Sequence, residues 1–416
     1  MTTTKTFTDL GSPESLLAGG TCNLPLRINA HIHLPPNFSA FETTAQAVAL
    51  TKAQGVNVLG VSNYYDYSVY KSFTAMAREN GIFPLYGLEI ITLDESMVRD
   101  GVLVNDPGNP GKFYICGKGI TKFDPLSPDA LVLLNIIRER DSERMAAVTE
   151  RLAARFAGAG FDTGLMATAV KERVVARHGS PLETVYLQER HVAQAFQEVL
   201  FERVPEAART ELLATAYGTA PKSAPGDANA VQNEIRSALM KAGKPAFVPE
   251  TFVDRDHAFR LILALGGIPC YPTLADGTNP MCGFEEPVED LITRLKKYGF
   301  TCAEFIPIRN TPKVLARYVR AMRDAGIVVT AGTEHNTRDL LPIAPTCVKG
   351  APIPAETQAI FEEGACVLAA HQYLASRGEP GFVDPHGKAN PNFATDEARI
   401  NHFAKLGRAV IEKYLG

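Results

Sequence analysis

Short apolar runs alternate with amphipathic segments of helical period along most of this chain. The apolar runs are Arg27–His33, Val56–Ser62, Phe83–Ile91, Phe113–Cys116, Gly267–Tyr271, Cys302–Ile308 and Ile327–Ala331. The amphipathic segments are Thr44–Gln54, Tyr67–Asn80, His257–Leu265, Val288–Tyr298 and Pro312–Ala325. A glycine follows each amphipathic segment, and glycine commonly ends a helix because it adopts the left-handed conformation at little cost. The pattern therefore predicts strands that alternate with helices.

Alternation of this kind is typical of a parallel sheet covered by helices. About seven strand–helix units fit it, which predicts an α/β protein built on a closed or nearly closed (β/α)7 barrel of the TIM-like type. The strands of such a barrel end on one common face, and that face carries the active site.

The alternation stops between residues 127 and 241. Ser127-Pro128-Asp129 is a good helix start, because serine caps the first turn and proline suits the first helical position. We therefore expect residues 127–241 to form a helical insertion. Residues 1–126 and 242–350 then form the two parts of the barrel, and residues 351–416 form a helical extension packed on it.

The composition is that of a soluble globular protein, with 45% hydrophobic and 21% charged residues. A net charge of −4 gives no sign of a nucleic-acid or membrane partner. The N-terminal stretch lacks the apolar core of a signal peptide, and no apolar run is long enough to span a bilayer. The seven cysteines are scattered, so we expect free thiols and a cytoplasmic protein. The sequence leaves the oligomeric state open.

The first apolar run ends in a pair of histidines, His31 and His33. Alternate residues of a strand point to the same side, so both imidazoles leave the strand together with Arg27 and Asn29. Two neutral imidazoles at this spacing can converge on one metal ion. The alternative is an edge strand whose two histidines are solvated.

Polar residues also mark the other predicted strands. They are Asn63 and Tyr64 after the second, Glu89 in the third, Tyr114 in the fourth, Tyr271 at the end of the fifth, Glu304 in the sixth, and Glu334 and His335 after the seventh. The alternative is that Glu89 pairs with a helix lysine and that the tyrosines belong to the core. Their recurrence at strand ends nevertheless favours one shared site.

These motifs resemble those of the polymerase-and-histidinol-phosphatase (PHP) domain family of metal-dependent phosphoesterases. His31-Ile-His33 matches the family's His-x-His motif, and Gly87-Leu-Glu89-Ile resembles its glutamate strand. Gly332-Thr-Glu334-His335 occupies the place of its closing Gly-Ser-Asp-x-His. The resemblance covers most of the chain. It implies a distorted barrel of the PHP type and a metal-dependent hydrolase.

Two further segments resemble the nucleotide-phosphatase branch of that family. Glu189-Arg190-His191-Val-Ala is similar to an Arg-Pro-His-Ile-Ala stretch in the branch's helical insertion. The segment that ends in Cys270-Tyr271-Pro272 resembles the approach to its Ala-His-Pro motif. A lone histidine in a helix is more often a surface or core residue, but the resemblance makes His191 a candidate for the site.

The departures from the family concern its metal ligands. Asn63-Tyr64 replaces an Asp-His pair, Tyr114 and Tyr271 stand where histidines are usual, and Leu34–Phe38 lacks the aspartate that often follows the histidine pair. Phenol is a poor ligand for hard divalent ions unless it ionises. The remaining set of His31, His33, Glu89, Glu334 and His335 is enough for one or two ions. Zinc or manganese suits such ligands, and iron is a third option.

The predicted function follows from this set. In the first hypothesis a metal ion activates water for hydrolysis. Asn63, Tyr64, Tyr114 and Tyr271 line the catalytic site, and Lys118, Arg190, His191 and Arg309 hold a small anionic substrate. The second hypothesis is a single-metal isomerase or lyase acting on a sugar acid. The third is a non-catalytic binder with a degraded metal site.

Overall fold

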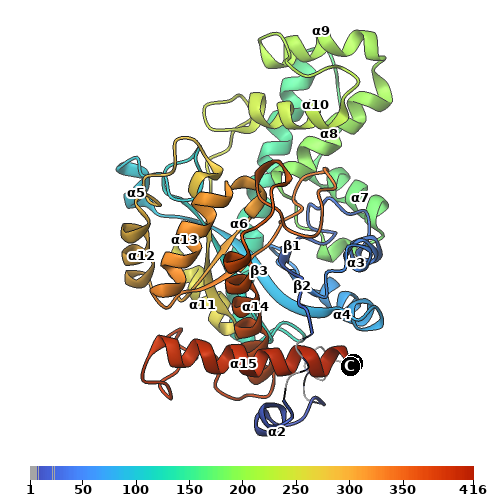
Figure 1. Ribbon diagram of the computed structural model, residues 1–416. Coiled ribbons are helices and arrows are strands. Elements are labelled where there is room, and N and C mark those ends of the chain that lie inside the picture. The colour runs from blue at the N-terminus through green and yellow to red at the C-terminus, as the bar shows by residue number, and fades with distance from the viewer. Residues whose placement is uncertain (1–6, 8, 21, 23) are drawn as a thin grey trace. The chain divides into compact units, whose positions relative to one another are not determined.

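In the computed structural model (Figure 1), the strands of the described residues form one seven-stranded sheet in the order β1 to β7. The structure describes residues 7, 9–20, 22 and 24–416. The strands are β1 Ile28–Ile32, β2 Val58–Val61, β3 Phe83–Leu93, β4 Lys112–Lys118, β5 Ile268–Thr273, β6 Cys302–Phe305 and β7 Val328–Ala331. A parallel bridge between Ile32 and Glu334 joins the first strand to the end of the seventh. The near-closed α/β barrel predicted from the alternating pattern is therefore confirmed.

One strand departs from the parallel arrangement that the alternation suggested. β4 runs antiparallel to both β3 and β5, while the other neighbouring pairs are parallel. A parallel crossover needs a covering helix, and the connection from β3 to β4 holds only α5 (Glu95–Arg99), which buries no residue. β4 therefore pairs along its whole length with residues 87–93, the carboxyl-terminal part of β3.

Helices separate the strands and pack on the barrel. Besides α5, these helices are α2 Pro13–Ala18, α3 Thr44–Ala53, α4 Val69–Glu79, α11 Arg255–Ala264, α12 Val288–Lys297, α13 Pro312–Asp324, α14 Ala355–Ser376 and α15 Asp396–Leu415. Short 3-10 turns lie at Ala275–Gly277, Pro307–Arg309 and Val348–Gly350. α14 packs against β7, and α15 crosses α14 near the C-terminus, as Figure 1 shows.

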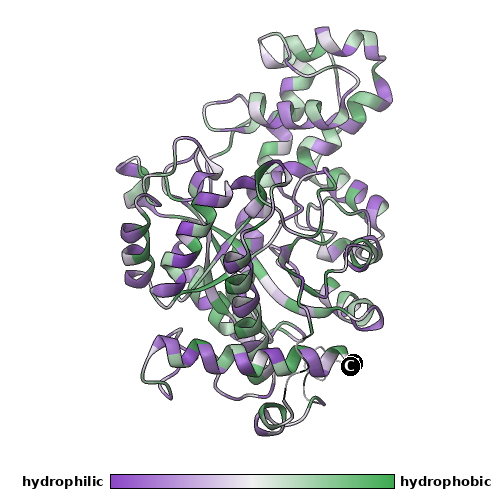
Figure 2. Cartoon of the chain, viewed as in Figure 1, coloured by the Kyte–Doolittle hydropathy of each residue, from purple (hydrophilic) through white to green (hydrophobic). Residues whose placement is uncertain are grey.

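The amphipathic pattern has the expected structural result. α12 buries Leu291 and Leu295, and α13 buries Leu315 and Val319, while their charged residues face away from the strands. Figure 2 shows hydrophobic residues concentrated on the strands and hydrophilic ones along these helices. No helix within the described residues is both long and apolar enough to cross a membrane.

The chain divides into two compact units. One comprises residues 1–34, 43–134 and 253–416 and contains the barrel; the other comprises residues 35–42 and 135–252. α6 (Pro128–Gly158) begins in the first unit and continues into the second. The boundaries at 127 and 241 remain predictions from the sequence.

The second unit is helical and has its own core. Its further elements are α7 Ala167–His178, a 3-10 turn at Leu182–Thr184, α8 Glu189–Arg203, α9 Glu206–Tyr217, α10 Ala228–Ile235 and a π-helical turn at Arg236–Met240. Val148, Leu152, Phe156, Phe196 and Leu200 are among its buried apolar residues. The inserted residues therefore have a hydrophobic core of their own and add no strand to the barrel among the described residues.

Candidate metal centre

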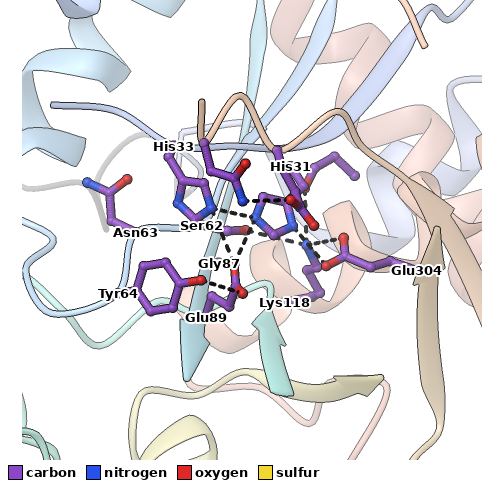
Figure 3. Close-up of polar contacts among 12 residues, drawn as sticks. His31, His33, Ser62, Asn63, Tyr64, Gly87, Glu89, Lys118 and Glu304 are labelled. Carbon is purple, nitrogen blue, oxygen red and sulfur yellow. Dashed lines mark hydrogen bonds and ion pairs between the residues drawn. The ribbon is translucent and has the colours of Figure 1, made fainter. Parts of the chain in front are cut away.

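His31, His33 and Glu89 bring three ligand atoms together inside the barrel. The Nε2 atoms of His31 and His33 are 3.3 Å apart. Oε2 of Glu89 lies 3.5 Å from the first and 3.2 Å from the second. Figure 3 shows the two imidazoles and the carboxylate pointing toward one another. The strand parity of the two histidines explains why they meet here, since they are two residues apart on one strand and its extension.

A buried carboxylate orients the first histidine from behind. Oε1 of Glu304, on β6, lies 2.8 Å from Nδ1 of His31. This contact assigns the ring proton to Nδ1 and leaves Nε2 as the coordinating atom, a common arrangement behind metal-binding histidines. The sequence counts Glu304 among the polar residues of a shared site but assigns it no role there.

Lys118 balances the charge of Glu304. Its Nζ lies 2.6 Å from Oε2 of Glu304 and donates to the carbonyl of Ala30 at 3.3 Å and to Oγ of Ser62 at 3.4 Å. The side chain of Lys118 is 2% exposed. The structure thus places Lys118, a predicted substrate-binding residue, beneath the ligand group as the partner of Glu304.

Tyr64 supports two of the three ligand residues. Its hydroxyl donates to Oε1 of Glu89 at 2.6 Å, and its ring stacks on that of His33 with centroids 5.3 Å apart. Burial raises the pKa of Tyr64 well above its usual value, and the negative charge of Glu89 adds to the effect. The phenol therefore stays protonated and acts as a hydrogen-bond donor.

Asn63 holds the backbone that follows the histidine pair. Its Oδ1 accepts from the amide of Leu34 at 2.9 Å, and its Nδ2 donates to the carbonyl of Leu34 at 2.9 Å. Both polar atoms of this amide are thus directed to the backbone. The structure gives Asn63 a positioning role, one step away from the ligand atoms.

Close packing of the backbone fixes the position of His31. A side chain at Gly332 would place its Cβ 2.3 Å from Cβ of His31, which no real contact allows. Only glycine therefore fits between the end of β7 and this histidine. The resemblance placed Gly332 in a motif, but its steric role depends on the pairing of β1 with β7 and could not be read from the sequence.

His335 lies near the site but has other partners. Its Nδ1 is 2.7 Å from Oγ1 of Thr333, and its Nε2 is 2.9 Å from the carbonyl of Leu341. Nδ2 of Asn29 donates to the same threonine oxygen at 2.6 Å. This chain of hydrogen bonds places the ring proton of His335 on Nε2, facing a carbonyl. The structure does not bring His335 into the group of three.

Glu334 pairs with an arginine. Oε1 and Oε2 of Glu334 accept from Nη1 and Nη2 of Arg309 at 2.9 and 2.5 Å. Although burial opposes it, the charge of Glu334 raises the pKa of Arg309, and Glu89 and Tyr64 contribute in the same direction. The predicted ligand Glu334 and the predicted anion-binding residue Arg309 therefore lie together beside the metal group.

The other two predicted tyrosines lie on opposite sides of the sheet. Tyr114 shares its side of β4 with Lys118, and its electrostatic interaction with Tyr64 contributes to the raised pKa of Tyr64. Tyr271 packs on Phe113, which precedes Tyr114 on β4 and therefore points to the opposite side of the sheet. The hydroxyl of Tyr271 donates to Oε1 of Glu285 at 2.7 Å. The structure brings Tyr114 toward the site and places Tyr271 outside the barrel.

Arg190 and His191 belong to the helical unit. Nδ1 of His191 accepts from the amide of Gln188 at 3.1 Å, which caps the start of α8. The guanidinium of Arg190 lies over the ring of Phe38, 5.8 Å from its centroid. Burial lowers the pKa of His191 to about 3, so the ring is neutral. A role for either residue in substrate binding remains a prediction.

The pKa values of this buried group depend on burial and on the charges within the group. Burial alone would lower the pKa of His31, but Glu304 raises it to about 9. Burial lowers the pKa of His33. Although burial opposes both shifts, His31 lowers the pKa of Glu304 to about 2, and His31 and His33 lower the pKa of Glu89. Both carboxylates are therefore ionised at neutral pH.

The donor set fits a divalent metal ion. In the described part of the chain two groups could hold one: His31 with His33 and Glu89, and His31 with Cys116 and Glu304. Glu304 of the second group is already paired with Lys118, so the first group is the better candidate. Its ligand atoms are 3.2–3.5 Å apart, and atoms on a tetrahedron with bonds of about 2.0–2.1 Å stand about 3.3–3.4 Å apart.

Solved structures with a similar fold support the barrel architecture. No family model and no curated protein matches the chain. An amidohydrolase from Chromobacterium violaceum, solved with bound sulfate and no metal, has a similar structure with 18% identity and a TM-score of 0.50. The match covers 80% of this chain and 96% of the amidohydrolase.

A second solved structure of similar fold comes from Bifidobacterium adolescentis and is classed as a metal-dependent phosphoesterase. It has 16% identity and a TM-score of 0.52, and the match covers 80% of this chain and 93% of that protein. Similarity at this level of identity shows a shared barrel fold.

Proposed function

We propose that this protein is a metal-dependent hydrolase of the PHP type that acts on a small anionic substrate, most simply a phosphoester. The observation that carries the proposal is the convergence of three buried ligand atoms from His31, His33 and Glu89, with Glu304 behind His31. Burying charged and polar groups costs free energy. A buried cluster of two carboxylates, two imidazoles and a lysine is therefore typical of a functional site.

His31, His33 and Glu89 would hold the ion. The near-tetrahedral spacing of their atoms favours zinc, and manganese is the next candidate because a carboxylate is present. A bound ion supplies Lewis acidity, which activates water and polarises an oxygen of the substrate. Glu334 and His335 would serve a second ion only by leaving Arg309 and Leu341.

The remaining residues position this group and the substrate. Tyr64 holds Glu89 by its second oxygen and packs flat on His33, so both ligands are fixed before a metal binds. Glu304 fixes the ring of His31, and Lys118 fixes Glu304. Arg309 is the best candidate for an oxyanion receptor, because its planar guanidinium already binds the carboxylate of Glu334 through two hydrogen bonds.

The solved structures of similar fold support this class of reaction. One is named an amidohydrolase and was obtained with bound sulfate, and the other is classed as a metal-dependent phosphoesterase. Sulfate resembles the phosphoryl group of a phosphoester in shape and charge. These names suggest the reaction class for this chain, and the donor set supplies the chemical reason for it.

An isomerase or lyase acting on a sugar acid is less well supported. That reaction needs a group that exchanges protons near neutral pH, and the tyrosines were the candidates. Burial holds the pKa of Tyr64 far above that range, and Tyr271 lies outside the barrel. A non-catalytic binder would have no need for the matched spacing of three ligand atoms.

The experiment that tests the proposal is substrate profiling of the zinc- and manganese-loaded protein. Phosphomonoesters, phosphodiesters, amides and sugar acids are assayed in parallel at the same concentration. We expect turnover of phosphoesters that depends on the added metal and is lost in His31→Ala. Turnover of sugar acids alone, or no metal-dependent turnover in any class, would contradict the proposed function.

A further inference from the structure

Arg309 and Glu334 form a two-point ion pair at the ends of neighbouring strands. Arg309 closes the 3-10 turn Pro307–Arg309 that follows β6, and Glu334 follows β7. The two parallel hydrogen bonds match the fork of a guanidinium to both oxygens of one carboxylate. Nδ2 of Asn336 also donates to Oε2 of Glu334 at 2.7 Å. Three donors therefore surround this carboxylate.

The backbone places this pair directly beside the metal group. The amide of Glu334 donates to the carbonyl of His31 at 2.8 Å, and the amide of His33 donates to the carbonyl of Glu334 at 2.9 Å. Glu334 thus bridges the backbone on both sides of Ile32. A charged group held by Arg309 would lie next to the histidine pair.

The backbone at this point is strained. Glu334 and His335 are consecutive non-glycine residues in the left-handed region, with φ of 57° and 52°. Residues with side chains adopt this conformation at a cost in free energy, and such strain gathers at ligand clamps and switch regions. The hydrogen bonds of Glu334 to Arg309 and Asn336 help to offset that cost.

We propose that Glu334 is an internal stand-in for the substrate's oxyanion and that Arg309 is the oxyanion receptor of the site. The ligand is a small phosphate, sulfate or carboxylate group, which takes the place of the Glu334 carboxylate on the guanidinium of Arg309. This proposal deepens the proposed function, because it assigns the residue that holds the anionic group of the substrate. It rests on the proposed function only for the hydrolysis of that substrate, and not for the binding of the anion.

The chemistry of the pair supports an exchange of anions. A carboxylate, a sulfate and a phosphate each offer two oxygens at a spacing that a guanidinium binds in the same two-point way. The side chain of Arg309 is 36% exposed and that of Glu334 is 12% exposed, so an anion can approach Arg309 from solvent. Removal of the Glu334 charge leaves Arg309 without its competing anion.

Titration of metal-free protein with inorganic phosphate, followed by calorimetry, tests this proposal. We expect Glu334→Gln to bind phosphate about tenfold more tightly than the wild type, because the competing carboxylate is gone. Glu334→Asp should change the affinity in the same direction by a smaller factor, since its shorter side chain withdraws from Arg309. Aspartate also tolerates the left-handed backbone, so this variant keeps the fold. Arg309→Gln should lose phosphate binding.

A matched control removes a carboxylate of the same kind elsewhere. Glu363 pairs with Nε and Nη2 of Arg323 by two hydrogen bonds, between α13 and α14. Glu363→Gln should bind phosphate as the wild type does. Parallel titrations with sulfate and acetate show which oxyanion the receptor prefers.

Two results would overturn the proposal. One is phosphate binding in both Glu334 variants that is equal to or weaker than in the wild type, which would make the pair a structural ion pair. The other is wild-type affinity in Arg309→Gln. Because these titrations use metal-free protein, their outcome is separate from that of the hydrolase assay.

Discussion

Two buried tyrosines of the barrel donate to a glutamate in nearly the same way, and the two pairs differ in their surroundings. Inside the barrel Tyr64 donates to Glu89 at 2.6 Å, and outside it Tyr271 donates to Glu285 at 2.7 Å. The histidines beside Glu89 lower its pKa, whereas burial raises the pKa of Glu285 to about 7.

The comparison shows that the groups around a carboxylate decide whether it can act as a metal ligand. Glu285 is satisfied by the amides of Leu274 and Ala275 and by one hydroxyl, a set that shapes a turn. Glu89 is held by one hydroxyl and faces two imidazoles, a set that suits a metal ion. The same two residue types therefore make a structural contact on one side of the sheet and a ligand on the other.

The largest difference between the pairs should appear when each glutamate is changed. Glu89→Gln removes a charged ligand, and we expect zinc affinity to fall by at least about 100-fold. Glu285→Gln should leave zinc affinity unchanged, because Glu285 lies outside the barrel. Competition with a chromophoric chelator measures both. Equal losses in the two variants would show that the comparison is wrong.

The charge balance inside the barrel should be visible in stability. Lys118→Met removes one of the two cations beside the buried Glu304 and leaves His31 as the other, and we expect the free energy of unfolding to fall by up to ~3–5 kcal/mol. The double variant Lys118→Met with Glu304→Gln should recover part of this loss, because both charges are gone. Urea denaturation of the metal-free proteins measures the difference. A fall of less than ~1 kcal/mol in the single variant would argue against the pairing.

Replacing the two tyrosines should reveal a smaller difference between the two pairs. Tyr64→Phe keeps the ring on His33 but removes the donor to Glu89, and we expect zinc affinity to fall about tenfold. Tyr271→Phe should keep the zinc affinity and lower the free energy of unfolding by ~1–3 kcal/mol, since Glu285 loses a buried partner. Chelator competition and urea denaturation together test this. Weaker zinc binding in Tyr271→Phe alone would reverse the assignment.

A further prediction concerns pH. The pKa of Glu285 is raised in the folded state to about 7 from an ordinary value of 4.5. The folded protein then binds more protons than the unfolded chain between these values, so the contribution of Glu285 to stability falls as pH rises from 4.5 to 7. The slope is at most ~1.4 kcal/mol per pH unit. Denaturation midpoints from pH 5 to 8 should show a shallower fall in Glu285→Gln; an identical slope would contradict the assignment.

Much of this arrangement could be predicted from the sequence. The alternation of strands and helices predicted the barrel, and strand parity predicted that His31 and His33 point the same way. The direction of β4 could not be predicted in this way, because the pattern of a strand is the same in both directions. It depends on the connection, whose single short helix α5 covers no face of the sheet.

The sequence could not show which side of the sheet a residue faces or which side chains of different strands meet. Cys270 and Tyr271 lie in a strand that is apolar on both sides, so alternation gave no information on which of them points inward. Glu304 and Lys118 meet across β6 and β4, and only the register of distant strands brings them together. Their roles therefore required the structure.

The most direct test of the central claim is the metal content of His33→Ala beside that of the wild type. Both proteins are stripped with chelator, loaded with zinc or manganese, desalted and analysed for metal by mass spectrometry. We predict one or two ions per chain in the wild type and none in His33→Ala, with circular dichroism spectra that coincide. Full metal content in His33→Ala, or no metal in the wild type under saturating zinc and manganese, would contradict the assignment of His31, His33 and Glu89 as a metal site.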